Sequence, residues 1–428
     1  MFADRHADER VGRKVWLPQL FPRLDYVTLF LAILGVCLWG LSVEAMNEAP
    51  LTLKQAIDQA LVRYPQAPVL AAREAEVEAL AGRGQSLTAG SPAIVVSYFD
   101  DRPLTNTGFY ELEGGFEVPL WRWGQRRASQ KVANAARVSL KPARAVLRLE
   151  VGALVREAIW QAALAQNNLE LANEELKTAR ALEQDVERRV VLGELAKTDR
   201  LLAEAETLRE ETVVAQATAE RQRSEETYRV LTGFPRLPIA RSETVHVPMT
   251  IGSDHPLLLE ANARIAQART EFIALRSAGP GAPQLFLGAR QEKGADLIDA
   301  TNSLGIGLRL PFGGQAHRQV EVTAAARALA EATAERDALV RRLGVTLTEA
   351  KLDLKAIEAA YQLAQSQNRI AREHFRLMRI AFEVGETDLV NLLRVQGQAF
   401  AAERAERELA IQRERAVARL NQAAGTVP

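Results

Sequence analysis

Two periodicities alternate along this chain, and each predicts a different kind of element. Four short segments alternate apolar and polar side chains with a period of two, the pattern of a β-strand with two unlike faces. They lie at residues 94–99, 109–118, 284–290 and 303–310. The stretches that follow them carry apolar residues every three or four positions, as amphipathic helices do. We therefore expect a mainly α protein with two short β-hairpins, at residues 92–118 and 283–311.

The helical stretches that follow the hairpins are unusually long. The second runs from Gln315 to Val384 without a proline, and as one helix it would extend about 105 Å. Its apolar seam has the three-four spacing of a coiled coil: Leu347, Ala350, Leu354, Ile357, Tyr361 and Ala364. The first carries a similar stripe: Leu169, Ala172, Leu176, Ala179, Leu182, Val186 and Val190. A kink is expected at Pro142. A glycine and a returning stretch follow each, which predicts antiparallel helix pairs at residues 124–233 and 314–425.

Landmarks of the first half return in the second half at an offset of 191 or 192 residues. Tyr64-Pro65 is echoed by His255-Pro256, and Val118-Pro119-Leu120 is echoed by Leu310-Pro311-Phe312. Similarity at a fixed spacing is the signature of an internal repeat. We therefore predict two structural repeats, residues 46–240 and 241–428, each made of a helix, a β-hairpin and a long helix pair.

The first 45 residues have the layout of a secretory signal peptide. Basic residues precede an apolar run from Tyr26 to Leu41, and small residues stand near the end, in Val43-Glu44-Ala45. The run is short for a membrane-spanning helix, which needs about 20 residues. An uncleaved anchor and a lipoprotein acylated at Cys37 are the alternatives. We expect residues 1–45 to be removed and the remainder to be exported.

Charge and composition narrow the function classes. The 428 residues include 54 basic and 54 acidic side chains, so the chain lacks the positive charge expected of a nucleic-acid binder. Cys37 is the one cysteine, and the sequence contains no phosphate-binding glycine loop, nucleophile elbow or zinc-protease helix. The histidines beyond the signal region are not spaced as paired metal ligands: His246, His255, His317 and His374. We therefore predict no enzymatic activity and no cofactor or bound metal.

The four predicted strands are compatible with a membrane location, because about 9 to 11 tilted residues cross a bilayer. A half-buried soluble sheet would show the same alternation. However, the connections are polar, and Trp121 and Trp123 flank an arginine at a strand end, which suits a membrane–water interface. Four strands cannot close the barrel that lipid requires, whereas three chains supply twelve. The sequence thus predicts an obligate oligomer with a shared pore.

The polar faces of these strands would line that pore. They carry Glu111, Glu113, Glu117 and Arg309, and a ring of carboxylates would favour cations. An ordinary solvated polar face is the alternative.

Together these features resemble the TolC-like outer-membrane efflux proteins, over nearly all of residues 50–425. The local sequence is similar as well, in Leu51-Thr52-Leu53-Lys54-Gln55-Ala56, in Val118-Pro119-Leu120 with Gly124, and in Gly385-Glu386-Thr387-Asp388-Leu389. Within that family the chain is most similar to the outer-membrane components of cobalt–zinc–cadmium type heavy-metal exporters.

The resemblance implies a homotrimer in which a 12-stranded β-barrel in the outer membrane continues into a long α-helical barrel across the periplasm. Its inner end would dock with a periplasmic adaptor and an inner-membrane pump, usually proton-driven, and substrate, here heavy-metal cations, would pass passively. By position, the periplasmic tip, which forms the gate and the adaptor contact, would contain Arg189, Gly193, Glu194, Asp199, Gly385, Glu386 and Asp388. A periplasmic adaptor or a coiled-coil scaffold without a pore is the alternative.

Overall fold

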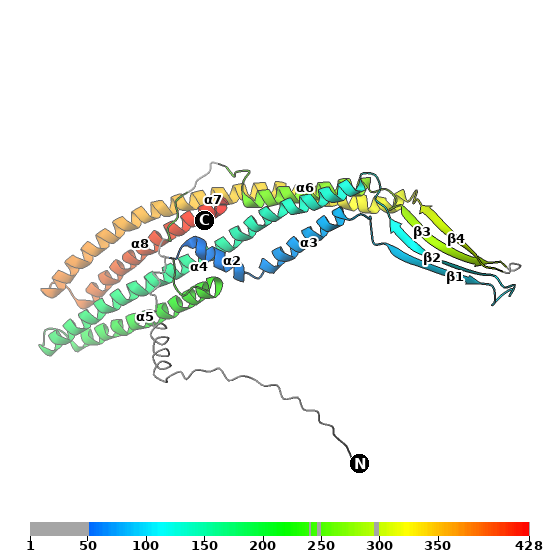
Figure 1. The fold of residues 1–428 in the computed structure, drawn as a ribbon. Coiled ribbons are helices and arrows are strands. Elements are labelled where there is room, and N and C mark those ends of the chain that lie inside the picture. Colours follow the sequence, from blue (N-terminus) through cyan, green and yellow to red (C-terminus); the bar gives the residue numbers. More distant parts are fainter. Residues whose placement is uncertain (1–50, 239–240, 246–249, 295–298, 428) are drawn as a thin grey trace, which may run out of the picture. The chain divides into compact units, whose positions relative to one another are not determined.

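The computed structural model describes residues 51–238, 241–245, 250–294 and 299–427 (Figure 1). The predicted signal peptide at residues 1–45, Cys37 and His246 lie outside these ranges, as does the side chain of His317. The helices are α2 (Leu53–Arg63), α3 (Ala67–Gln85), α4 (Gln125–Val191), α5 (Lys197–Thr232), α6 (Pro256–Ser277), α7 (Gln315–Glu383) and α8 (Leu389–Ala423). The strands are β1 (Ala93–Asp100), β2 (Tyr110–Pro119), β3 (Gln284–Lys293) and β4 (Thr301–Arg309).

The four strands form one antiparallel sheet in the order β1-β2-β3-β4. Each hairpin of the sequence prediction pairs with itself, and β2 then joins β3 from Tyr110 opposite Lys293 to Pro119 opposite Gln284. Among the described residues, β1 and β4 therefore each pair on one side only. An exposed edge of this kind offers unpaired amide groups to another strand.

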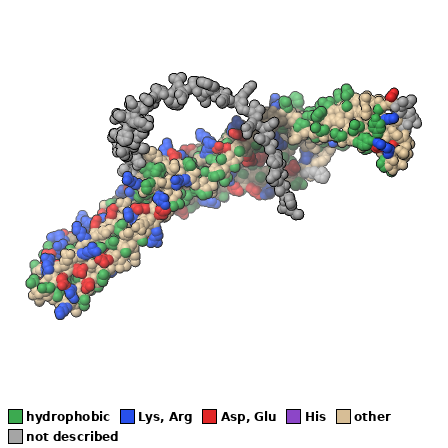
Figure 2. All heavy atoms as spheres, turned by 60° about the horizontal axis from the view of Figure 1, so that its bottom comes forward, with side chains coloured by type: hydrophobic (Ala, Val, Ile, Leu, Met, Phe, Trp, Pro, Cys, Tyr) green, Lys and Arg blue, Asp and Glu red, His purple; other side chains and the backbone are tan. Residues whose placement is uncertain are grey.

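The pairing register sorts the side chains onto two unlike faces. Glu113 of β2 lies opposite Arg290 of β3, whereas its neighbour Leu112 lies opposite Gln291. The apolar face is exposed, with Ile306 80% and Leu304 90% accessible. Its members are Ile94, Val96, Tyr98, Leu112, Phe116, Val118, Leu285, Leu287, Ala289, Leu304, Ile306 and Leu308. Figure 2 shows hydrophobic side chains gathered over the sheet, whereas charged side chains are spread along the helices.

The long helices follow the predicted seams. In α7, Leu347, Leu354 and Ala364 are buried. Leu347 and Leu354 pack against α8 together with half-buried Ala350 and Ile357. In α4, Ala172, Leu176, Ala179 and Val186 of the predicted stripe are buried, and α4 packs against α5. The two antiparallel pairs, α4 with α5 and α7 with α8, are therefore as predicted (Figure 1). None of the described helices combines the length and the apolarity of a membrane-spanning segment.

Helix α4 runs through Pro142 as one helix of 67 residues. The proline thus leaves the helix continuous, although it removes one backbone donor. Near the middle of α4, Val151 and Val155 pack with Ile57 of α2 and Tyr228 of α5 in a buried cluster.

Both long helices end at a glycine in the left-handed region of the backbone. Gly193 has φ of 81° and Gly385 has φ of 84°, and glycine adopts this conformation without a Cβ clash. In both turns, the amide two residues past the helix cap bonds back into the last turn: Glu194 donates to the Arg189 carbonyl and Glu386 donates to the Ala381 carbonyl, each at 2.8 Å.

Alanine should have opposite effects on stability at a glycine in one of these turns and at a glycine inside a helix. Gly385→Ala should destabilise the protein by about 1 kcal/mol, because the left-handed conformation costs an L-residue about that much. Gly344→Ala, within α7 where a Cβ would meet no atom within 4 Å, should stabilise it by about 1 kcal/mol. The two variants should therefore shift the midpoint of thermal unfolding in opposite directions; equal shifts would contradict this description of the turns.

The exposed apolar face of the sheet predicts that a charged side chain introduced there will prevent assembly in the membrane. Ile306→Arg should abolish assembly in the membrane, because an arginine on the lipid side of a strand costs about 2–4 kcal/mol near the midplane. Gly305→Arg is the control, since Gly305 is the next residue, lies on the opposite face and has open space around its Cβ. The amount of oligomer extracted from membranes measures the difference, and a normal yield of Ile306→Arg would rule out a lipid-facing surface.

Candidate functional site

The register places all four predicted pore residues on the polar face of the sheet. Glu111, Glu113 and Glu117 alternate along β2, and Arg309 lies at the end of β4 in the row next to Glu117. Two further charged side chains share this face, Arg290 and Glu292 of β3. The alternating pattern of the sequence already placed Arg290 on the polar side of its strand. Only the pairing register shows which carboxylates Arg290 contacts.

Arginines neutralise part of this acidic face. The Arg290 guanidinium lies 3.0 Å from a Glu111 oxygen and 2.7 Å from a Glu292 oxygen, and Arg309 lies 3.4 Å from Glu117. Glu113 instead accepts a hydrogen bond from the Ser97 hydroxyl at 3.5 Å. Four carboxylates and two guanidinium groups leave the face negative, but the charge is smaller than three free glutamates per chain would give.

Phe286 lies on the same polar face and covers a row of glycines. A Cβ added to Gly115 would come within 2.8 Å of the Phe286 ring, and one added to Gly288 would come within 2.6 Å of it. The glycines therefore allow the aromatic ring to lie against the backbone of β2 and β3. This contact was not predicted from the sequence, because it needs the register between the two hairpins.

The two tryptophans predicted at the membrane interface differ in their contacts. Trp121 is half-buried, and its indole N–H donates to the Ser86 carbonyl at 3.0 Å. Arg126 donates to the neighbouring Gln85 carbonyl at 2.7 Å. Both side chains thus satisfy carbonyls at the end of α3, which a helix cannot pair internally. Trp123, by contrast, is fully exposed.

At the other end of the helices, the predicted tip residues other than Arg189 fall into three groups. The glycines Gly193 and Gly385 form the turns. Asp199 accepts a hydrogen bond from the Ala196 amide at 3.1 Å, and Asp388 accepts one from the Asn391 amide at 2.7 Å, so both carboxylates cap the returning helices. Glu194 and Glu386 are exposed.

Arg189 joins the two turns. Its guanidinium donates to the backbone carbonyls of Phe382 at 3.2 Å and Glu383 at 3.3 Å, and it lies 5.1 Å from the centre of the Phe382 ring. A carboxylate oxygen of Asp185, one turn earlier on α4, lies 3.1 Å from Nε of Arg189. The last carbonyls of α7 lack partners within the helix, and a cation at that end is favoured by the helix dipole. Arg189 therefore binds the first half of the chain to the end of α7.

A small apolar core lies beneath this contact. Val186 of α4 and Ala203 of α5 are buried against Phe382, Leu389 and Leu392 of the second half. The tip is thus a packed unit made of both helix pairs, and Arg189 is its polar connection.

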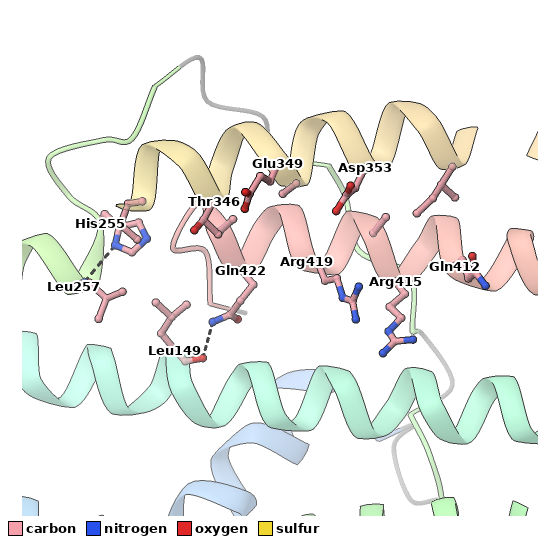
Figure 3. A pocket seen from close by; sticks show the side chains of 15 residues that line it. Leu149, His255, Leu257, Thr346, Glu349, Asp353, Gln412, Arg415, Arg419 and Gln422 are labelled. Carbon is pink, nitrogen blue, oxygen red and sulfur yellow. Dashed lines mark hydrogen bonds between the residues drawn. The ribbon is translucent and has the colours of Figure 1, made fainter. Parts of the chain in front are cut away.

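Farther along the helices from the turns at Gly193 and Gly385, polar side chains connect α4 to α8. Arg156 is 4% exposed and forms two 2.7 Å hydrogen bonds with Glu243 and one of 2.6 Å with Gln422. Arg415 and Arg419 point from α8 toward α4, where both contact Glu157 (Figure 3). Arg415 and Arg419 border a hollow of about 490 Å³ between α4, α7 and α8.

His255 lines the same hollow and acts as a helix cap (Figure 3). Its Nδ1 accepts a hydrogen bond from the Leu257 amide at 3.2 Å, and burial lowers the pKa of the imidazole below its ordinary value. His374 lies far from it on α7. Within the described residues, no three His, Cys, Asp or Glu side chains are grouped to hold a metal ion.

Comparisons with known proteins agree with this architecture. Residues 250–426 match the model of the family described as "Outer membrane efflux protein". The chain is 23% identical over 322 residues to the cobalt-zinc-cadmium resistance protein CzcC of Cupriavidus metallidurans, covering 73% of this chain and 75% of that protein.

Two solved structures share the fold. The outer membrane protein VceC of Vibrio cholerae superimposes with a TM-score of 0.70 at 16% identity, over 87% of this chain and 96% of VceC. The CmeC outer membrane channel of Campylobacter jejuni gives a TM-score of 0.69 at 15% identity, over 96% of this chain and 94% of CmeC. The predicted resemblance is therefore confirmed: residues 250–426 match the outer membrane efflux protein family, and the described chain has the same fold as these two outer-membrane proteins.

Proposed function

We propose that this protein is the outer-membrane channel of a tripartite efflux system, and that it conducts heavy-metal cations passively. The observation that carries the proposal is the four-stranded sheet, which has an exposed apolar face and two edges that no other described strand pairs with. A sheet surrounded by lipid must close on itself, because unpaired backbone groups are too costly there. Three copies would supply twelve strands, with β4 of each chain beside β1 of the next.

The long helices support the periplasmic part of the proposal. Helices α4 and α7 have 67 and 69 residues, which correspond to about 100 Å each. They lead from the sheet to the turns at Gly193 and Gly385 (Figure 1). We place the sheet in the outer membrane and these turns at the periplasmic tip, where a periplasmic adaptor would bind and connect the channel to an inner-membrane pump. Energy would come from that pump, usually driven by protons.

The charge of the polar face supports a cationic substrate. Glu111, Glu113, Glu117 and Glu292 outnumber Arg290 and Arg309 on each chain, and a negative pore lining favours cations. The metals named for the relative CzcC are cobalt, zinc and cadmium, and we extend that substrate class to this chain. A coiled-coil scaffold or a periplasmic adaptor would explain the helices but would leave the exposed apolar face of the sheet without a role.

The division into repeats of residues 46–240 and 241–428 is part of the same proposal. Helix, hairpin, long helix and returning helix follow one another twice, as α3-β1-β2-α4-α5 and as α6-β3-β4-α7-α8. In this interpretation Arg189 holds the tip closed at rest, because it connects the first repeat to the end of the second.

The assembly and the substrate can be tested separately. Light scattering of the protein extracted from the outer-membrane fraction should give three times the mass of the mature chain, and the purified species should conduct in planar bilayers. Deletion of the gene should sensitise the host to cobalt, zinc or cadmium. A soluble monomer would overturn the channel, whereas conduction without any change in metal tolerance would overturn only the metal substrate.

Arg189 gives a test of the gate. Arg189→Ala should increase the fraction of time that the channel is open in planar bilayers, since loss of the hydrogen bonds to α7 weakens the tip by about 2 kcal/mol. Arg188→Ala is the matched control, because Arg188 is 75% exposed and pairs with Asp185 on its own helix. Equal conductance records from the two variants would show that Arg189 does not hold the tip closed.

A further inference from the structure

The seam between α4 and α5 contains two buried carboxylates. Glu210 of α5 is 2% exposed and Glu175 of α4 is 3% exposed. Glu210 occupies a position in line with the buried residues Ala203, Thr207 and Ser224 of α5, where a coiled coil places apolar side chains. Glutamate is almost never fully buried unless it is paired. The two residues therefore need a physical explanation that the channel function does not supply.

Each carboxylate has one arginine partner and one oxygen without a partner. Oε2 of Glu175 lies 2.6 Å from Arg404 of α8, and Oε1 of Glu210 lies 2.7 Å from Arg209 of its own helix. The remaining oxygens, Oε1 of Glu175 and Oε2 of Glu210, are buried without a hydrogen bond. A buried acceptor without a donor is costly, and a protonated carboxyl group supplies a donor that an ionised one lacks.

The surrounding charges do not remove this cost. Arg404 and Glu403 of α8 face Glu175, and Arg209 and Glu206 of α5 face Glu210. Glu403 is in turn paired with Arg372 at 2.6 Å and Arg407 at 2.7 Å. Guanidinium groups therefore match these carboxylates in number, but none of them donates to the remaining oxygens of Glu175 and Glu210. Burial raises the pKa of both Glu175 and Glu210, and repulsion from Glu210 raises the pKa of Glu175 further.

We propose that Glu175 and Glu210 bind one proton as a pair, and that this proton holds the lower part of α5 against α4. Both residues lie about 25 Å along their helices from the turn at Gly193, so the pair lies between the body of the molecule and its tip. Loss of the proton leaves two buried negative charges that repel each other, and this loosens the segment. The pair lies within a single chain, so its titration does not depend on whether the assembled protein conducts.

The direction of the pH dependence follows from the raised pKa. In a locally opened state the carboxylates reach water and titrate near the ordinary value of 4.5, whereas the packed state keeps the proton to higher pH. The packed state is therefore favoured at low pH and loses stability as the pH rises from about 4.5 through the raised pKa. In that window the opening constant should grow up to about tenfold per pH unit for one proton.

Hydrogen exchange of the full-length protein in detergent measures this opening. After correction for the intrinsic exchange rate, protection of amides in residues 203–217 should fall by up to about tenfold per pH unit in the wild type. Glu210→Gln should remove the pH dependence and raise protection at neutral pH. Glu204→Gln, an exposed carboxylate on the same helix, should behave as the wild type does. Faster exchange of Glu210→Gln at neutral pH, or a flat wild-type profile, would overturn the proposal.

A second measurement does not depend on how the variant folds. Infrared spectroscopy of the wild type should show the carbonyl band of a protonated carboxyl group that persists above the pH at which exposed carboxyl groups ionise and disappears as the pH rises further. The absence of any titrating band of this kind in wild-type protein would exclude proton binding by the pair.

Discussion

The ladder between β2 and β3 is the contact on which the rest of the structure depends. Among the strands that the structure describes, it is the one pairing that joins the first half of the chain to the second. Because side chains alternate across a strand, a slip of one residue would move every apolar side chain of one hairpin to the polar face. The observed register instead combines both hairpins into a single apolar face, and it brings Arg290 to Glu111.

The halves are joined in a different way along the helices. Ion pairs and polar side chains make several of the contacts between α4 and α8, including Arg156 with Gln422, Arg404 with Glu175 and Arg415 with Glu157. Partly exposed pairs such as Arg415 with Glu157 exchange with water at modest net cost, whereas a ladder in lipid cannot open. A firm sheet and an adjustable helical body are therefore built into one chain.

The long-range patterns could be predicted from the sequence, and the specific contacts could not. Alternation gave the four strands, and three-four spacing gave the buried seam from Leu347 to Ala364, because both patterns reflect burial against a neighbour. The role of Arg189 could not be predicted, since its partners are backbone carbonyls nearly two hundred residues away. The same is true of Trp121, because its hydrogen bond to the Ser86 carbonyl cannot be inferred from the sequence. Glu210 could not be singled out from the sequence either, because only the structure shows that it and Glu175 are buried.

The pairing of β2 with β3 also constrains the order in which the protein can form. Pro119 pairs with Gln284, so the entire first helix pair must be synthesised before this ladder can begin. Contacts between residues so distant in sequence form slowly, because the intervening chain must first lose its freedom. Until then the first hairpin has an apolar face and an open β2 edge, which is the kind of surface that aggregates. During synthesis of a molecule built in this way, the first hairpin must therefore stay apart from other chains until the second hairpin is available to pair with it.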